Sequence, residues 1–362
     1  MKPRHQSILL ILLLSLPLGV FAQARYQFDT YAGGVDGFRD GDRKTALLRS
    51  PEGIATDATG NLYITEYKSS IVRKITTDGR VSLLAGQPMK TGYADGNGRN
   101  ALFNRPHGLA VDKAGTVYVC DMKNHLIRSI SPGGRVGTVA GKAGRSGRAD
   151  GLKENARFNQ PEGIVVSSTG ELFVVDTYNF TVRKITRDGL VTTLAGAGGV
   201  AGYADGRGSS VRFNKPIGIA IDSRDNLYIT DADYDGKSAG NCLIRKIDLQ
   251  GNVTTLGGVA GKAGHNDGPL KTARFNRPVG IAVAPDGTLF VADTEADLVR
   301  RIDTNGIVST IAGQYLVEKA EDGVGAAAAF FDPQSIVVAP NGDIFMTDTL
   351  NNRIVAGREM PH

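Results

Sequence analysis

A proline-centred segment recurs six times along this chain, and its constant spacing limits the fold more than any other feature. Successive prolines are 55 residues apart, except across the fourth interval, which is 62. An Asp-Gly pair stands eleven residues before each of them. A fixed period of this length is typical of a modular array in which each repeat forms one supersecondary unit. The repeated prolines are Pro51, Pro106, Pro161, Pro216, Pro278 and Pro333.

Each repeat contains four short apolar runs that are divided by turn residues. The run after the proline, such as 163–166, is apolar on both faces, as an innermost strand should be. The fourth run, such as 191–196, carries β-branched threonines that suit an exposed outer strand. Dipeptides such as Asp78-Gly79 separate the third and fourth runs and favour tight hairpins. Four antiparallel strands repeated six times predict an all-β, six-bladed β-propeller.

The two ends of the repeat array predict how the ring closes. Residues 26–33 match the pattern of the fourth run, whereas the last repeat stops after its third run. We therefore expect the N-terminal strand to complete the last four-stranded blade. Such closure removes the free sheet edges of an open array, and it is compatible with a monomer.

The first 24 residues have the features of a secretory signal peptide. A basic start precedes an apolar run from Ile8 to Val20, and the small-residue pattern 22–24 follows. The run is shorter than the roughly 20 residues that a membrane span needs, and no later stretch is long enough. We expect a signal peptide over 1–24, one propeller domain over 25–362, and a secreted or periplasmic protein.

Three motifs of the repeat resemble the NHL family. They read Pro-x-Gly-Ile-Ala-Val-Asp, then Gly-Asn-Leu-Tyr-Ile-Thr-Asp, then Asn-x-x-Ile-Arg-Lys-Ile, and the resemblance covers nearly all of 26–357. The long connectors are similar to those of secreted bacterial NHL-repeat proteins. The resemblance implies a six-bladed propeller, most often used as a binding platform, and it implies no single activity. The absence of Trp argues against a WD-type propeller.

An acid ends the second run of every repeat, and an arginine follows in the third run of five. Because a catalytic group is needed only once, this repetition favours structural charge pairs and turn caps over chemistry. The connector Asp-Gly pairs have the same structural interpretation. The acids are Glu66, Asp121, Asp176, Asp231, Asp293 and Asp348, and the arginines are Arg73, Arg128, Arg183, Arg245 and Arg300, with Val355 at the sixth position.

The position between the proline and the glycine of the first run departs from the repeat. The NHL fold places it near the mouth of the central channel, where four polar residues from consecutive blades would form an arc. Two carboxylates and an imidazole there could hold a divalent cation or perform acid–base chemistry. A water-filled channel mouth also tolerates polar residues without any such role. The four are Gln334, Glu52, His107 and Glu162.

The longer fourth interval inserts an acidic loop into blade 4. Its Asp231, Asp233 and Asp235 are followed by Gly236, which resembles the start of a calcium loop. Cys242 stands where the bidentate Glu of such a loop belongs, and no helices flank the segment. The loop is therefore read either as a calcium site or as a solvated acidic turn.

Charge and composition narrow the function without defining it. The formal charge of +5 falls to +3 when Lys2 and Arg4 leave with the signal peptide, and no basic block remains. Nucleic acid is therefore not an expected partner. We expect an exported module that binds a protein or small-molecule ligand on a propeller face or at the channel mouth. The alternative is a metal-dependent hydrolase or lyase, which would resemble lactonase-type propellers that hold a metal in the channel.

Overall fold

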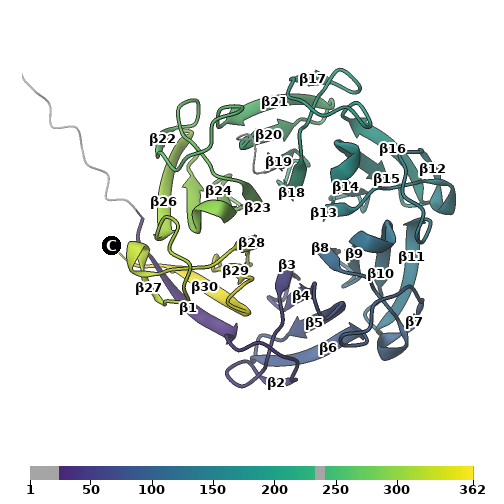
Figure 1. The fold of residues 1–362 in the computed structure, drawn as a ribbon, viewed down its shortest axis with the longest axis horizontal. Helices are drawn as coiled ribbons and strands as arrows, with labels where there is room; N and C mark the ends of the chain where they lie inside the picture. The colour runs from purple at the N-terminus through teal and green to yellow at the C-terminus, as the bar shows by residue number, and fades with distance from the viewer. Residues whose placement is uncertain (1–23, 233–240, 362) are drawn as a thin grey trace, which may run out of the picture.

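The structure is a computed structural model that describes residues 24–232 and 241–361. Six antiparallel sheets are arranged as blades around a central channel, in a closed ring (Figure 1). The expected all-β, six-bladed propeller is therefore confirmed. The signal peptide expected over 1–24 lies, except for Ala24, outside the described residues, and so do Asp233 and Asp235 of the expected calcium loop.

The four expected strands of each blade are present, and in the first five blades they follow sequence order from the channel outward. The innermost strands begin at the repeated prolines, namely β3 (Pro51–Thr56), β8 (Pro106–Val111), β13 (Pro161–Val166), β18 (Pro216–Ile221), β23 (Pro278–Val283) and β28 (Pro333–Val338). The second strands are β4 (Leu62–Glu66), β9 (Val117–Asp121), β14 (Leu172–Asp176), β19 (Leu227–Asp231), β24 (Leu289–Asp293) and β29 (Ile344–Asp348). The third strands are β5 (Ile71–Ile75), β10 (Leu126–Ile130), β15 (Thr181–Ile185), β20 (Leu243–Ile247), β25 (Leu298–Ile302) and β30 (Arg353–Glu359).

The fourth strand of the last blade comes from the other end of the chain. The fourth strands are β6 (Arg80–Gly86), β11 (Arg135–Gly141), β16 (Leu190–Ala195), β21 (Asn252–Gly257), β26 (Ile307–Gly313) and, in blade 6, β1 (Tyr26–Gly33). Strand β1 runs antiparallel to β30, from Tyr26 opposite Glu359 to Gly33 opposite Arg353, with one bulge. In Figure 1 the purple β1 lies against the yellow β30. The expected closure of the ring by the N-terminal strand is thus present.

A fifth, two-residue strand was not expected from the sequence. It follows the Asp of each connector and pairs with the edge of the fourth strand, as Gly41 and Asp42 pair with Val81 and Arg80. These strands are β2 (Gly41–Asp42), β7 (Gly96–Asn97), β12 (Gly151–Leu152), β17 (Gly206–Arg207), β22 (Gly268–Pro269) and β27 (Gly323–Val324). Short 3-10 helices are η1 (Gly98–Asn100), η3 (Lys153–Asn155) and η6 (Gly325–Ala327) in connectors, and η2 (Met122–Asn124), η4 (Thr177–Asn179) and η5 (Thr294–Ala296) after second strands.

The hydrophobic core is divided into wedges between neighbouring blades. One wedge joins Ile54 and Leu62 of blade 1 to Phe345 and Ile354 of blade 6. The aromatic residue of the connector is fully buried in five of the wedges, as Phe158 is in the wedge between blades 2 and 3. Each blade therefore buries its two faces against different neighbours, so that every blade contributes to two of the wedges.

Candidate functional site

The acid and the arginine of each repeat form a buried ion pair within the blade. In blade 2, Arg128 Nη1 lies 2.7 Å from Asp121 Oδ2, and both side chains are fully buried. The same arginine reaches the connector residue Asp95 at 2.6 Å through Nη2. Its guanidinium also lies over the ring of Phe103, 5.1 Å from the centroid. One arginine therefore ties the second strand, the third strand and the connector together.

Blade 6 forms the same pair from a different position. The third-strand residue expected to align with the arginines is Val355, but Arg353 places Nε 2.6 Å from Asp348 and Nη1 2.8 Å from Asp322. The sequence register missed this residue because Arg353 stands five residues after the acid, whereas Arg128 stands seven after its own. All six blades thus use these acids structurally, which accounts for their repetition.

Asp231, the first residue of the expected calcium loop, is also the acid of its blade. Its Oδ1 accepts hydrogen bonds from the backbone amides of Asn214 and Lys215, both at 2.9 Å. Its Oδ2 accepts from Asn241 at 2.9 Å and pairs with Arg245 at 3.2 Å. The Asp231 carboxylate is therefore already surrounded by donors within the blade.

The four polar residues expected at the channel mouth do gather around one cavity. Glu52, His107, Glu162 and Gln334 each occupy the second position of an innermost strand, and all line a cavity of about 260 Å³. His107 Nε2 lies 3.1 Å from Glu52 Oε2. Its Nδ1 lies 3.2 Å from the backbone oxygen of Glu162. Gln334 instead donates to Asp332 at 2.9 Å.

The cavity has further polar walls that the sequence analysis did not single out. Tyr67 and Tyr178 follow second strands, Lys123 lies in η2, and Lys215 and Arg277 directly precede the repeated prolines. The residue before each proline varies around the ring as strongly as the residue after it. The rule that identified the first four, departure from the repeat, would therefore have found the two cations as well.

The charges at the mouth are strongly coupled. Burial alone would lower the pKa of His107, but the hydrogen bond and the charge of Glu52, with a contribution from Glu162, raise it to about 9. His107 is therefore an imidazolium at neutral pH. Burial raises the pKa of Glu162, against the lowering effect of the His107 and Lys215 charges. The mouth thus holds an imidazolium between two carboxyl groups.

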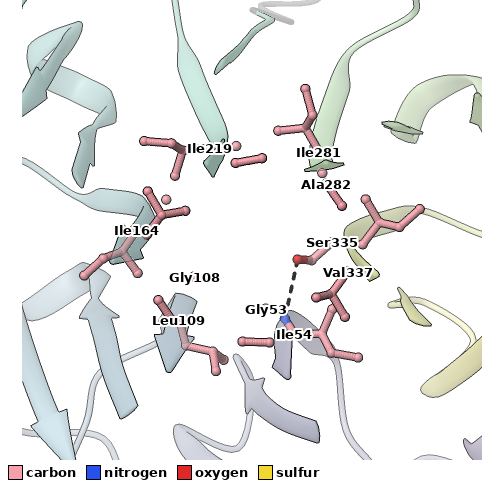
Figure 2. Close-up of a pocket in the computed structure, with 18 of the residues that line it drawn as sticks. Gly53, Ile54, Gly108, Leu109, Ile164, Ile219, Ile281, Ala282, Ser335 and Val337 are labelled. Atoms are coloured by element: carbon pink, nitrogen blue, oxygen red, sulfur yellow. Dashed lines mark hydrogen bonds between the residues drawn. The ribbon is translucent and has the colours of Figure 1, made fainter. Parts of the chain in front are cut away.

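Below this mouth the channel becomes apolar. Its lumen, about 280 Å³, is lined by innermost strands of the six blades, and His107, Glu162, Ile217 and Gln334 border both spaces. Figure 2 shows aliphatic side chains such as Ile164, Ile219 and Ile281 around the lumen. A molecule at the mouth could therefore place a polar part among charges and an apolar part among aliphatic side chains.

Two features are absent from the described ranges, 24–232 and 241–361. No three His, Cys, Asp or Glu side chains there are grouped closely enough to hold a metal ion. No helix within these ranges is both long and apolar enough to cross a membrane. At the mouth, the ring nitrogens of His107 already face Glu52 and the Glu162 backbone.

Comparisons with known proteins agree with the repeat. The teneurin NHL domain pattern matches residues 31–131, and the NHL repeat pattern matches 158–185 and 275–301. SUPPRESSOR OF QUENCHING 1 of Arabidopsis thaliana is 31% identical over 76% of this chain and 27% of its own length. NHL repeat-containing protein 2 of Bos taurus is 27% identical over 79% of this chain and 43% of its own length. The chain thus spans less than half of either relative.

Three solved structures share the fold at low identity. An auxiliary nutrient binding protein from Bacteroides thetaiotaomicron matches with a TM-score of 0.68 at 15% identity, over 93% of this chain and 77% of the other. A gluconolactonase from Xanthomonas campestris gives 0.58 at 14%, over 92% and 90%. A virginiamycin B lyase from Staphylococcus aureus gives 0.54 at 16%, over 93% and 89%. These likenesses concern the fold alone, whereas the repeat patterns concern the sequence: this chain carries NHL repeats.

Proposed function

We propose that this NHL-repeat propeller is a binding module that takes a small-molecule ligand at the mouth of its central channel. The observation that carries the proposal is the gathering of charged side chains at one cavity, in a ring whose blades are otherwise alike. Glu52, His107, Glu162 and Lys215 occupy equivalent or neighbouring repeat positions and yet differ from blade to blade. Concave sites with a few convergent polar groups beside apolar walls are typical of ligand sites.

The test compares ligand binding between the wild-type chain and a mouth variant. A panel of metabolites is tested by saturation-transfer NMR against the wild type, Glu162→Gln and the control Glu154→Gln. Glu154 is exposed in η3, away from the mouth cavity. We expect at least one small molecule whose signal is lost in Glu162→Gln and kept in Glu154→Gln. If no bound molecule distinguishes the two variants, the mouth is not the binding site.

The second candidate is a metal-dependent hydrolase or lyase, and the His107–Glu52 pair is the observation that favours it. A carboxylate 3.1 Å from an imidazole is an arrangement used in acid–base catalysis. Both ring nitrogens of His107 already face partners, so few ligand atoms at the mouth remain for a metal ion. Metal analysis of the purified protein decides the matter: a stoichiometric ion that is lost in Glu52→Ala would support the enzyme. The same measurement on Asp233→Ala tests the calcium loop.

We also propose that the protein is exported, on the basis of residues 1–24. The apolar centre and the small-residue pattern ending at Ala24 support cleavage before Arg25. N-terminal sequencing of the protein recovered from the exported fraction should begin at Arg25. Recovery of the uncleaved chain from the cytoplasm would contradict export.

A further inference from the structure

Glu162 is a largely buried side chain at the mouth whose carboxyl oxygens have no direct hydrogen-bond or ion-pair partner in the described chain, although the His107 and Lys215 charges lie near enough to act on it. Its side chain lies at the boundary between the mouth cavity and the apolar lumen, and the residue is only 8% exposed. Within 24–232 and 241–361 its carboxylate accepts no hydrogen bond and forms no ion pair. The blade acids differ, since Asp121 accepts from a backbone amide, Asn124 and Arg128.

Such a carboxylate calls for a donor from outside the chain. Buried polar groups in folded proteins are nearly always hydrogen-bonded, and a buried charge without a partner is destabilising. A ligand that brings an ammonium group to Glu162 would supply both the hydrogen bonds and the opposite charge.

Lys215 is the cation of the same cavity that remains available to a ligand. Lys123 donates to Gln160, and Arg277 pairs with Glu295 at 3.0 Å. The Lys215 ammonium lies over the ring of Tyr178, 5.4 Å from its centroid. In the described part of the chain it forms no ion pair, so its N–H groups can reach an anionic acceptor.

The apolar lumen begins beside these two charges. Ile217, two residues after Lys215, lines both the mouth cavity and the lumen, and Ile219 lies further along the same strand. The mouth cavity of about 260 Å³ and the lumen of about 280 Å³ are adjacent, because they share His107, Glu162, Ile217 and Gln334 as lining residues. Together they fall within the size range of small-molecule sites, roughly 300–1,000 Å³.

We propose that the ligand is a zwitterionic α-amino acid with a branched aliphatic side chain. Its ammonium group lies at Glu162, its carboxylate at Lys215, and its side chain enters the lumen beside Ile219. This assignment rests on the proposed function, because it names the ligand class of that same cavity. A simple anion would leave Glu162 without a donor. A simple cation would pair with Glu162 but would leave Lys215 without an anionic partner.

The experiment uses three probes of nearly equal shape on the full propeller. L-leucine carries both charged groups, 4-methylpentanoate lacks the ammonium group, and 3-methylbutylamine lacks the carboxylate. Calorimetry should detect L-leucine and find each singly charged probe at least about 10-fold weaker, because each loses one charge-assisted contact. The variants Glu162→Gln and Lys215→Met should each weaken L-leucine by about 10- to 100-fold.

Lys246→Met is the matched control for Lys215→Met. Lys246 also lies over a tyrosine ring, 5.5 Å from the centroid of Tyr228, but it does not line the mouth cavity. This variant should bind L-leucine as the wild type does. An equal loss in both lysine variants would mean that general charge, and not the Lys215 contact, carries binding.

Two outcomes would overturn the assignment. The first is that L-leucine gives no binding heat up to about 10 mM, which corresponds to a binding free energy too small for a specific site. The second is that a singly charged probe binds as tightly as L-leucine, which would exclude a zwitterion site. If another small molecule still depends on Glu162, only the ligand class is wrong. If none does, the binding function at the mouth is wrong as well.

Discussion

Replacing Gly108 with alanine should destabilise the ring at the contact between blades 2 and 3. Gly108 is the third residue of β8, and a Cβ atom built there would lie 2.2 Å from the backbone oxygen of Glu162. The same Cβ would lie 3.2 Å from the Cα of Gly163. Ordinary contact begins at 3.4 Å, so the two innermost strands would have to separate by about 1 Å.

The cost should lie at the upper end of the range for overpacking. Inserting a methyl group into a packed interior typically costs about 1–3 kcal/mol. The obstructing atoms at Gly108 are backbone, and a closed ring allows no single blade to move outward alone. We therefore expect Gly108→Ala to lower the free energy of unfolding by about 3 kcal/mol. Because the Glu162 oxygen lies 3.2 Å from His107 Nδ1, the movement would also disturb the mouth.

The same position in other blades provides graded controls. A Cβ at Gly280 would lie 2.8 Å from the Gln334 oxygen, a milder overlap that should cost about 1 kcal/mol. Blade 6 already carries Ser335, whose hydroxyl accepts only a long hydrogen bond of 3.4 Å from the Ile54 amide. Ser335→Ala should therefore change stability by less than about 0.5 kcal/mol.

Urea unfolding at constant m-value measures the series. The midpoints should fall in the order Ser335→Ala, Gly280→Ala and Gly108→Ala, with the last the least stable. If Gly108→Ala unfolds at the same midpoint as Ser335→Ala, the close approach of the strands does not limit the residue at this position.

Three further predictions concern the ion pairs and the closure. Arg128→Met should cost about 3–5 kcal/mol in urea unfolding, because it leaves Asp121 buried without its cation, and adding Asp121→Leu should recover part of the loss. The raised pKa of His107, about 9, contributes stability that is fully present below about pH 6.5 and is lost as pH rises through 9. Glu52→Gln should remove this dependence, on the order of 3 kcal/mol at most, in unfolding curves between pH 6 and about 10. Deleting residues 25–33 removes β1 and should lower the melting temperature of the whole ring; a truncation that melts like the chain beginning at Arg25 would contradict the closure.

The repeat alone predicted the blades, because strand alternation and turn dipeptides are local signals. The fifth strands were missed for a physical reason: a pair such as Gly41 and Asp42 is too short to produce any periodicity. Gly41 and Asp42 pair with β6, and Arg73 holds the preceding Asp40 at 2.8 Å. This contact spans distant parts of the sequence, so pattern reading cannot detect it.

The same limit applies to the mouth. The positions of Glu52, His107 and Glu162 followed from the repeat register, and the structure places them around one cavity. The distances between them did not follow, because the register fixes only which blade each residue belongs to. Neighbouring blades bring Glu52 and His107 to 3.1 Å. Lys215 and Arg277 also line the mouth cavity. The direction of their side chains is set by the backbone of the turn before the proline, which the repeat pattern does not specify.

The innermost strand separates the residues that build the ring from those that vary at the mouth. Its third position is held to glycine in five blades by the carbonyl oxygen of the next blade, as at Gly108. Its second position borders the cavity: the side chains of His107 and Glu162 line the mouth, whereas their backbone oxygens face the glycines of the preceding blades. Substitution at the second position therefore leaves the contact between the strands intact. This explains how six nearly identical blades can carry different charges at one mouth, and it places the search for a ligand at the positions that the ring itself does not need.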